Sequence, residues 1–184
     1  MKTALVVLAV AISSTAVTHA RAQVAWSAIA SSCTLMTNGE TLANVDAVFG
    51  TVNFAAGKAG DFKLTCPIHA LPEGAAVPND LAITFYDDND FIEGRNHCFI
   101  SADLLRSNLN NIEHGGDADT ISTVNYPASG RSNLNRLLME KLDFSTSYYW
   151  VDVQLHRDSP TARCNPVFVG LYLDTFPPAA KRGS

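Results

Sequence analysis

The chain has no excess of positive charge and, beyond its first residues, no long hydrophobic run. Its 184 residues include 18 Asp and Glu against 13 Lys and Arg, which gives a net charge of −5. A protein that binds a phosphate backbone needs a basic face, so no nucleic acid is expected as a partner, and an anionic membrane surface is equally disfavoured. After residue 22 no apolar stretch reaches the roughly 20 residues of a spanning helix, so we expect no membrane span once the first segment is removed.

Short catalytic and redox motifs are also missing from the chain. It contains no GxSxG serine motif, no HxH or HExxH pair of histidines, and no CxxC pair of cysteines. The sequence therefore assigns no catalytic residue, and we expect a protein that is not an enzyme. A small secreted hydrolase is an alternative, because folding decides which acids, serines and histidines meet.

What the chain does have is an export signal at its start. Lys2 supplies a positive charge, residues 4–12 are apolar, and Ala20-Arg21-Ala22 forms an A-x-A cleavage site. This order is typical of a secretory signal peptide, which is too short to span a bilayer. We interpret residues 1–22 as a signal peptide and expect the mature protein to be secreted or periplasmic.

The four cysteines then meet an oxidising environment. An even number of cysteines in an exported domain indicates disulfides, and four cysteines allow three connectivities. We favour Cys33–Cys66 and Cys98–Cys164, because the first pair bounds a compact N-terminal unit and the second joins the middle of the chain to its last strand. Free buried thiols are the alternative.

Short segments with alternating apolar residues recur along the chain, separated by clusters of Gly, Asn, Asp and Pro. Alternation with period two predicts half-buried β-strands. We expect strands over 34–36, 48–54, 62–66, 81–86, 98–104, 121–126, 147–157 and 167–173, and long polar loops over 67–80 and 105–120. The pattern indicates an all-β protein with an antiparallel two-sheet β-sandwich of jelly-roll or immunoglobulin-like topology. We expect one domain over 23–176 and a flexible tail over 177–184.

One segment departs from this alternation. Leu134, Leu137, Leu138 and Leu142 are spaced by three, one and four residues, which places them on one face of a helix. Ser132 is a residue type that caps helices. We therefore expect a short helix near 133–142, with an irregular strand as the alternative.

The densest acidic cluster follows the strand expected over 81–86. Asp88, Asp90 and Glu93 supply oxygen ligands at nearly alternating positions, as calcium prefers. The spacing does not match a twelve-residue EF-hand loop. A calcium site made by Asp88, Asp90 and Glu93 is possible in a sandwich loop, and an ordinary solvated turn is the alternative.

The strand expected over 147–157 has an unusual polar face. Alternation places Val151, Val153 and Leu155 on one side. The other side carries Tyr148, Trp150, Asp152, Gln154 and His156. Aromatic rings stack on the apolar faces of sugars while polar groups bind hydroxyls, so this side is the candidate ligand-binding site. The alternative is that a loop or helix covers Tyr148 and Trp150.

Three segments together resemble a group of small exported bacterial proteins of unassigned function. They are the Cys33 start, 60–68 (GDFKLTCPI), and the end formed by 148–157 (YYWVDVQLHR) with 166–171 (PVFVGL). In place of a YYD-like segment of that group stands 85–88 (FYDD). The resemblance covers much of the mature chain and implies a β fold, without an activity.

A weaker resemblance is to pilus subunits of the spore coat protein U type. It rests on 33–35 (CTL), 49–51 (FGT) and 64–66 (LTC) in that order, and the rest of the chain does not follow the pattern. It implies a subunit of a surface fibre or coat, which would need an N-terminal donor strand that 23–31 is barely long enough to supply. Our primary expectation remains a ligand-binding or surface-structural module whose partner is an extracellular polysaccharide or a surface protein.

Overall fold

The computed structural model describes residues 23–36, 39–69, 71, 77–87, 97–108, 118–127, 130–138 and 140–175. For residues 23, 87, 125–127 and 130–137 only the backbone is described. The expected signal peptide, the expected tail and the three expected calcium ligands Asp88, Asp90 and Glu93 lie outside these residues. Among the described residues no helix is long and apolar enough to cross a membrane.

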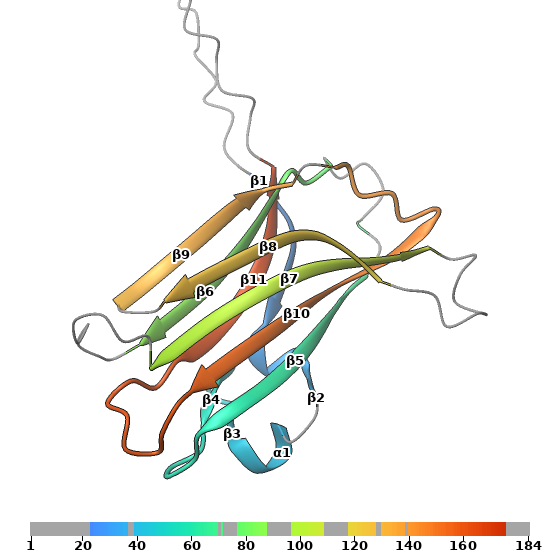
Figure 1. Ribbon diagram of the computed structural model, residues 1–184. Helices are drawn as coiled ribbons and strands as arrows, with labels where there is room; N and C mark the ends of the chain where they lie inside the picture. The colour runs from blue at the N-terminus through green and yellow to red at the C-terminus, as the bar shows by residue number, and fades with distance from the viewer. Residues whose placement is uncertain are drawn as a thin grey trace, which may run out of the picture.

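The described strands form two antiparallel sheets that lie as two layers (Figure 1). The six-stranded sheet has the order β3-β4-β11-β6-β9, with β1 also paired to β11, and the five-stranded sheet has the order β2-β5-β10-β7-β8. The strands of the first sheet are β1 Gln23–Ile29, β3 Ala43–Asp46, β4 Thr51–Phe54, β6 Asp80–Asp87, β9 Gly130–Leu137 and β11 Val167–Thr175. Those of the second are β2 Thr34–Met36, β5 Gly60–Ile68, β7 Cys98–Asn108, β8 Asp119–Pro127 and β10 Ser147–Arg157.

Apolar side chains from the facing sides of both sheets make one core. Alternate residues of β5 and β10 are buried, as expected for strands with one face inward. Leu64 of β5, Val153 of β10, Ile83 of β6 and Leu171 of β11 are each at most 2% exposed and belong to the same cluster. The sequence expectation of an antiparallel two-sheet β-sandwich with one short helix is therefore confirmed.

The position expected for the helix is wrong. Residues 130–137 form strand β9, which pairs with all eight residues of β6, and the short helix is α1, Gly39–Leu42. Without β9 the edge of β6 would leave a row of backbone hydrogen-bonding groups unsatisfied, and that pairing outweighs the helical spacing of the leucines. The spacing has a different origin, because Leu138 and Leu142 follow the strand and pack onto the core from the next segment.

Strand bounds differ most where turns or edges intervene. The strand expected over 48–54 begins only at Thr51, because Asp46 Oδ1 accepts hydrogen bonds from the N–H groups of Val48 and Phe49 and holds a turn there. The polar loop expected over 105–120 is shorter, since β7 continues to Asn108 and β8 starts at Asp119. Strands β1 and β3 were not expected, β9 overlaps the irregular strand that was the alternative to the helix, and β10 has the bounds predicted for it.

Both favoured disulfides are present. Cys33–Cys66 joins the residue before β2 to β5. Cys98–Cys164 joins the first residue of β7 to the segment between β10 and β11, rather than to the last strand itself. The two bonds close loops with sequence separations of 33 and 66 residues, which restricts the unfolded chain. Disulfides of this kind are compatible with an extracellular or periplasmic protein.

Candidate ligand-binding face on strand β10

Strand β10 separates its two kinds of side chain as the alternation predicted. Val151, Val153 and Leu155 are fully buried in the core. On the other side Tyr148 is 57% exposed, and the remaining four predicted residues are partly exposed. We call this side of β10, with the neighbouring residues of β5 and β7 that share it, the outer β10 face. The residues predicted on it from β10 are Tyr148, Trp150, Asp152, Gln154 and His156.

An apolar row crosses the face at Trp150. In the sheet register Trp150 lies opposite Pro67 of β5 and opposite Leu105 of β7. Paired residues on neighbouring strands point to the same side of a sheet, so these three side chains form adjacent parts of one surface. Tyr148, two residues before Trp150, lies at the next position along the strand and faces Ser107. The aromatic pair therefore sits at one end of the face.

A row of oxygen atoms crosses the face next to the apolar row. Asp152 of β10 lies directly opposite Asp103 of β7. Thr65 donates a hydrogen bond to Asp152 Oδ1 over 2.7 Å, and Thr123 donates one to Asp103 Oδ1 over 2.6 Å. Lys63 Nζ is 3.8 Å from Asp152 Oδ2. Two aspartates thus occupy paired positions at the centre of the face, and the carboxylate of each accepts a hydrogen bond from a threonine on the strand beyond it.

The far end of the face is built around His156. Its ring is stacked on that of Phe99, with centroids 4.7 Å apart and planes inclined by 13°. Nδ1 of His156 is 2.8 Å from Asp61 Oδ1, and Nε2 contacts Asp158 Oδ1. Gln154 donates a hydrogen bond to the same oxygen of Asp61 over 3.1 Å. A protonated imidazole donates from both nitrogens, so this arrangement fits the charged form of His156.

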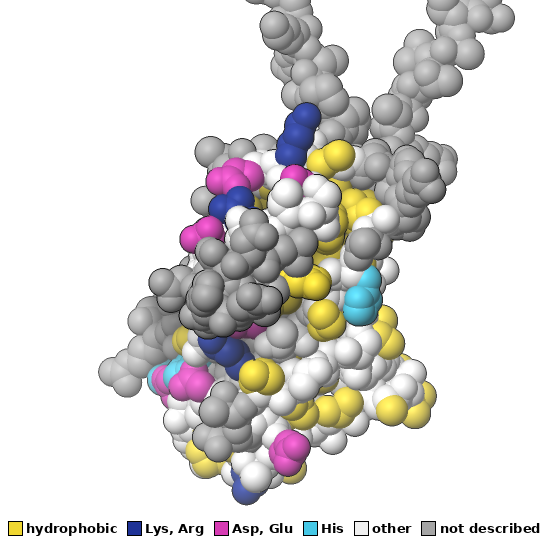
Figure 2. Space-filling model, turned by 90° about the vertical axis from the view of Figure 1, so that its right-hand side faces the viewer, with side chains coloured by type: hydrophobic (Ala, Val, Ile, Leu, Met, Phe, Trp, Pro, Cys, Tyr) yellow, Lys and Arg dark blue, Asp and Glu magenta, His cyan; other side chains and the backbone are white. Residues whose placement is uncertain are grey.

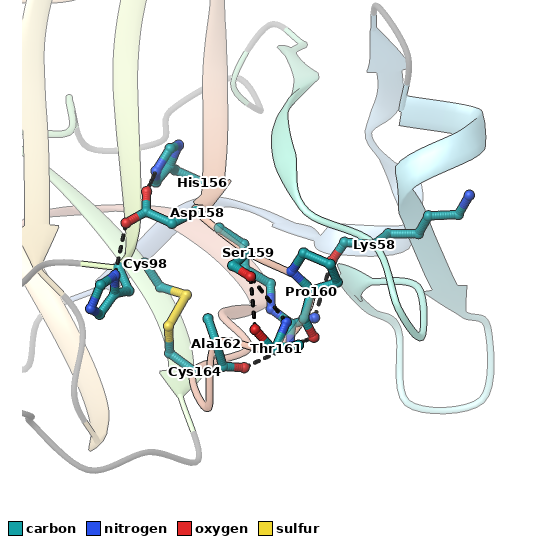
Figure 3. The surroundings of a disulfide bond; sticks show 11 residues. Lys58, Cys98, His156, Asp158, Ser159, Pro160, Thr161, Ala162 and Cys164 are labelled. Atoms are coloured by element: carbon teal, nitrogen blue, oxygen red, sulfur yellow. Dashed lines mark hydrogen bonds and ion pairs between the residues drawn. A yellow bond between two sulfur atoms is a disulfide. The ribbon is translucent and has the colours of Figure 1, made fainter.

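The charges around His156 shift its titration and that of its neighbour. Burial lowers the pKa of His156, but hydrogen bonds to Asp158 and Asp61, together with their negative charge, outweigh it and raise that pKa overall. Hydrogen bonds from His156 and from His97 lower the pKa of Asp158. His97 Nδ1 lies 2.9 Å from Asp158 Oδ2, so Asp158 bridges the two rings; Figure 3 shows its contact with His156.

The segment that carries Asp158 is fixed from the core side. Arg157 is 9% exposed, and its guanidinium donates hydrogen bonds to the carbonyl oxygens of Lys58, Pro160 and Ala162. The Cys98–Cys164 disulfide lies beside these contacts in Figure 3. The turn after β10 is therefore held by a buried cation and a covalent bond, and both place Asp158 next to His156.

Sequence reasoning found the β10 residues and missed their partners. Phe99, Ser101 and Asp103 occur at alternate positions of a strand that was predicted, so their common face could have been read from the sequence. That this face lies beside that of β10, and that Asp103 meets Asp152, depends on strand order and register, which no local pattern encodes.

The metal prediction is not tested by this structure. Its three residues, Asp88, Asp90 and Glu93, lie in 88–96, outside the described part of the chain. Within the described residues no group of three or more His, Cys, Asp or Glu could hold a metal ion. The calcium site therefore stays a prediction.

No family model and no curated protein matches the chain. Among solved structures, it is similar to a family two carbohydrate esterase from Cellvibrio japonicus at 12% identity and a TM-score of 0.39. It is also similar to the carbohydrate-binding module CBM36 in complex with calcium and xylotriose, at 14% identity and a TM-score of 0.40. A third similar structure is the Agl-KA catalytic domain, at 11% identity and a TM-score of 0.37. The match to the esterase covers 85% of this chain and 35% of the esterase chain. The match to CBM36 covers 82% of this chain and 99% of the module, and the match to the Agl-KA domain covers 86% and 28%. Similarities this distant assign no function.

Proposed function

We propose that the chain is an exported, non-catalytic protein that binds a polysaccharide through the outer β10 face. The observation that carries the proposal is the exposed Tyr148 beside Trp150, at the end of a row of hydrogen-bonding groups on a rigid strand. An exposed tyrosine next to a partly exposed tryptophan costs solubility, which favours a partner that covers both rings. Sugar rings supply that cover, because their C–H faces stack on aromatic rings.

The polar groups of the face suit the edges of the same sugars. Asp152 and Asp103 accept hydrogen bonds from hydroxyls, while Gln154 and His156 are already oriented by Asp61. Side chains held by neighbours lose little entropy when a ligand binds. Their placement on a central strand rather than on a loop keeps the row straight, which suits an extended chain of sugar units.

The first test compares two aromatic substitutions. Trp150→Ala should lower the affinity for the polysaccharides that retard the native protein in affinity electrophoresis by about fivefold, since stacking contributes on the order of 1 kcal/mol per ring. Phe49→Ala is the matched control, because Phe49 is 78% exposed in the turn before β4, away from the face. Equal retention of the Trp150→Ala and native proteins would contradict the proposal.

Two other functions predicted from sequence give different results. A fibre subunit would polymerise, and size-exclusion chromatography separates that outcome from a monomer. In this structure β1 pairs with β11 of its own chain, so this position needs no strand from a second copy. A hydrolase would release reducing ends from the polysaccharide. Asp103 and Asp152 make that assay worthwhile, because paired carboxylates are the groups that cleave glycosidic bonds.

A further inference from the structure

The outer β10 face carries more negative than positive charge. Asp61, Asp103 and Asp152 lie on it, and Asp158 borders it, while its cations are Lys63 and His156. Near the end of β7 in the same sheet, Arg106 is already paired with Asp119 and Glu140. Figure 2, which views one flank of the molecule, shows acidic and basic side chains mostly along one margin and hydrophobic ones mostly toward the other. A ligand on this face meets an excess of carboxylates.

The central carboxylates are the part of this charge that is least compensated. Like charges directly opposite on neighbouring strands repel each other, and Asp103 faces Asp152 in this way. The threonines bind one oxygen of each but bring no charge. Lys63 is half exposed and 3.8 Å from Asp152 Oδ2, a geometry in which a surface ion pair contributes little. A positive charge placed over the pair would relieve the repulsion.

The apolar row next to the two carboxylates limits which kind of ligand can supply that positive charge. Trp150, Leu105 and Pro67 offer an apolar surface one row away from the carboxylates. A cation that lies within about 6 Å of an indole ring gains a further attraction to it. The ligand that fits both rows has an apolar ring face and a protonated amine on the same unit.

We infer that the ligand of this face is a polysaccharide with free amino groups, protonated near neutral pH, rather than a neutral or an acidic one. The inference rests on the proposed function and specifies its substrate class. Each amino sugar offers a C–H face to Trp150 and an ammonium group to Asp103 and Asp152. Acidic polysaccharides are repelled by the same carboxylates.

The direct test uses three soluble oligosaccharides of equal length. They are a glucosamine oligomer, the same oligomer fully N-acetylated, and an oligogalacturonate, each titrated calorimetrically into the native protein below pH 7. The glucosamine oligomer should bind about tenfold more tightly than its acetylated form, from the sum of two exposed ion pairs and a cation–π contact. The oligogalacturonate should not bind. Added salt should weaken only the first interaction.

Charge-neutral substitutions assign the preference to the two central carboxylates. Asp103→Asn and Asp152→Asn keep the side-chain shape. Each should lower the affinity for the glucosamine oligomer toward that for the acetylated oligomer, and the affinity for the acetylated oligomer should change little. Neither substitution should lower the melting temperature, because each removes a repulsion. Glu40→Gln on α1 removes the same charge away from the face and is the matched control.

The outcomes separate this inference from the proposed function. Equal affinity for the two oligomers, or a loss with Glu40→Gln as large as with Asp152→Asn, overturns the inference and leaves polysaccharide binding intact. If no oligosaccharide binds, or if Trp150→Ala binds them all as well as the native protein does, both are overturned.

Discussion

His156 lies flat against Phe99 while both of its ring nitrogens face carboxylates, one on Asp61 and one on Asp158. The contact joins three strands, β10, β7 and β5, to the turn that follows β10. The protonation state of the His156 ring therefore affects how firmly these strands and the turn are held together at this end of the outer β10 face. A neutral ring has only one N–H to donate, so loss of the proton turns one of the two contacts into a repulsion between lone pairs.

This contact makes stability depend on pH. The pKa of His156 is raised in the folded protein, so its contribution is fully present below the unfolded value of about 6.5 and is lost as pH rises through the folded pKa. Asp158 has a lowered pKa, so its contribution is present above its unfolded value of about 3.9 and is lost as pH falls through the folded pKa. The two effects predict greatest stability between these limits, measurable as melting temperature against pH.

Substitution isolates the histidine's part of that profile. His156→Gln should remove the decline on the alkaline side and reduce the decline on the acid side, because His156 is the larger of the two causes that lower the pKa of Asp158 and His97 is the other. His69→Gln, on an exposed histidine beyond the end of β5, is the matched control and should leave the profile unchanged. A His156→Gln profile that still declines as the native one does would show that another group is responsible.

The Cys98–Cys164 disulfide is expected to contribute to stability. Replacing both cysteines by alanine should lower the free energy of unfolding by about 2–4 kcal/mol, because the bond closes a loop with a sequence separation of 66 residues. Urea unfolding measures this loss, and a non-reducing peptide map checks both pairings in protein purified from an oxidising compartment. A map that joins Cys33 to either Cys98 or Cys164 would contradict the structure.

Gly170 is required for the contact between β1 and β11. A Cβ atom at this position would lie 2.6 Å from the carbonyl oxygen of Ala28, so the backbone of β1 would have to move. Gly170→Ala should therefore destabilise the protein by about 1–3 kcal/mol and expose residues 23–29 to proteolysis. Gly57→Ala has a positive φ but no atom within 4 Å of its Cβ, and should cost about 1–2 kcal/mol without exposing β1. Unchanged protection of β1 in Gly170→Ala would refute this role.

The sequence predicted what depends on local alternation. Strand β10 has eleven residues with an unbroken alternation, so its bounds and both of its faces followed from the pattern alone. Strand β9 did not, because its leucines are spaced as on a helix and only pairing with β6 makes it extended. Strand β3 is four residues long and has no clear alternation of burial. Short or edge strands take their conformation from a neighbour, which a local pattern does not contain.

The candidate site divides in the same way. The five β10 residues lie on the side of the strand away from the core, as the period of a strand predicts, and their role in binding a ligand stays a prediction. Asp61, Asp103 and Asp158 were missed, although each contacts or faces a predicted residue. Asp61 is 95 positions from His156 in the sequence, and Asp103 is brought opposite Asp152 only by the order of the strands. The two disulfides were predicted because export and an even cysteine count limit the choices to three.

The most direct test of polysaccharide binding reads Trp150 itself. The chain has two tryptophans, and Trp26 packs partly buried against the core, so a Trp26→Phe variant leaves Trp150 as the only indole. Titration of this variant with the glucosamine oligomer should change the wavelength and the intensity of Trp150 emission, and the change should saturate. The bound oligomer should also reduce the quenching of Trp150 fluorescence by acrylamide. A Trp150 emission and acrylamide quenching that stay unchanged at saturating oligosaccharide would contradict the account.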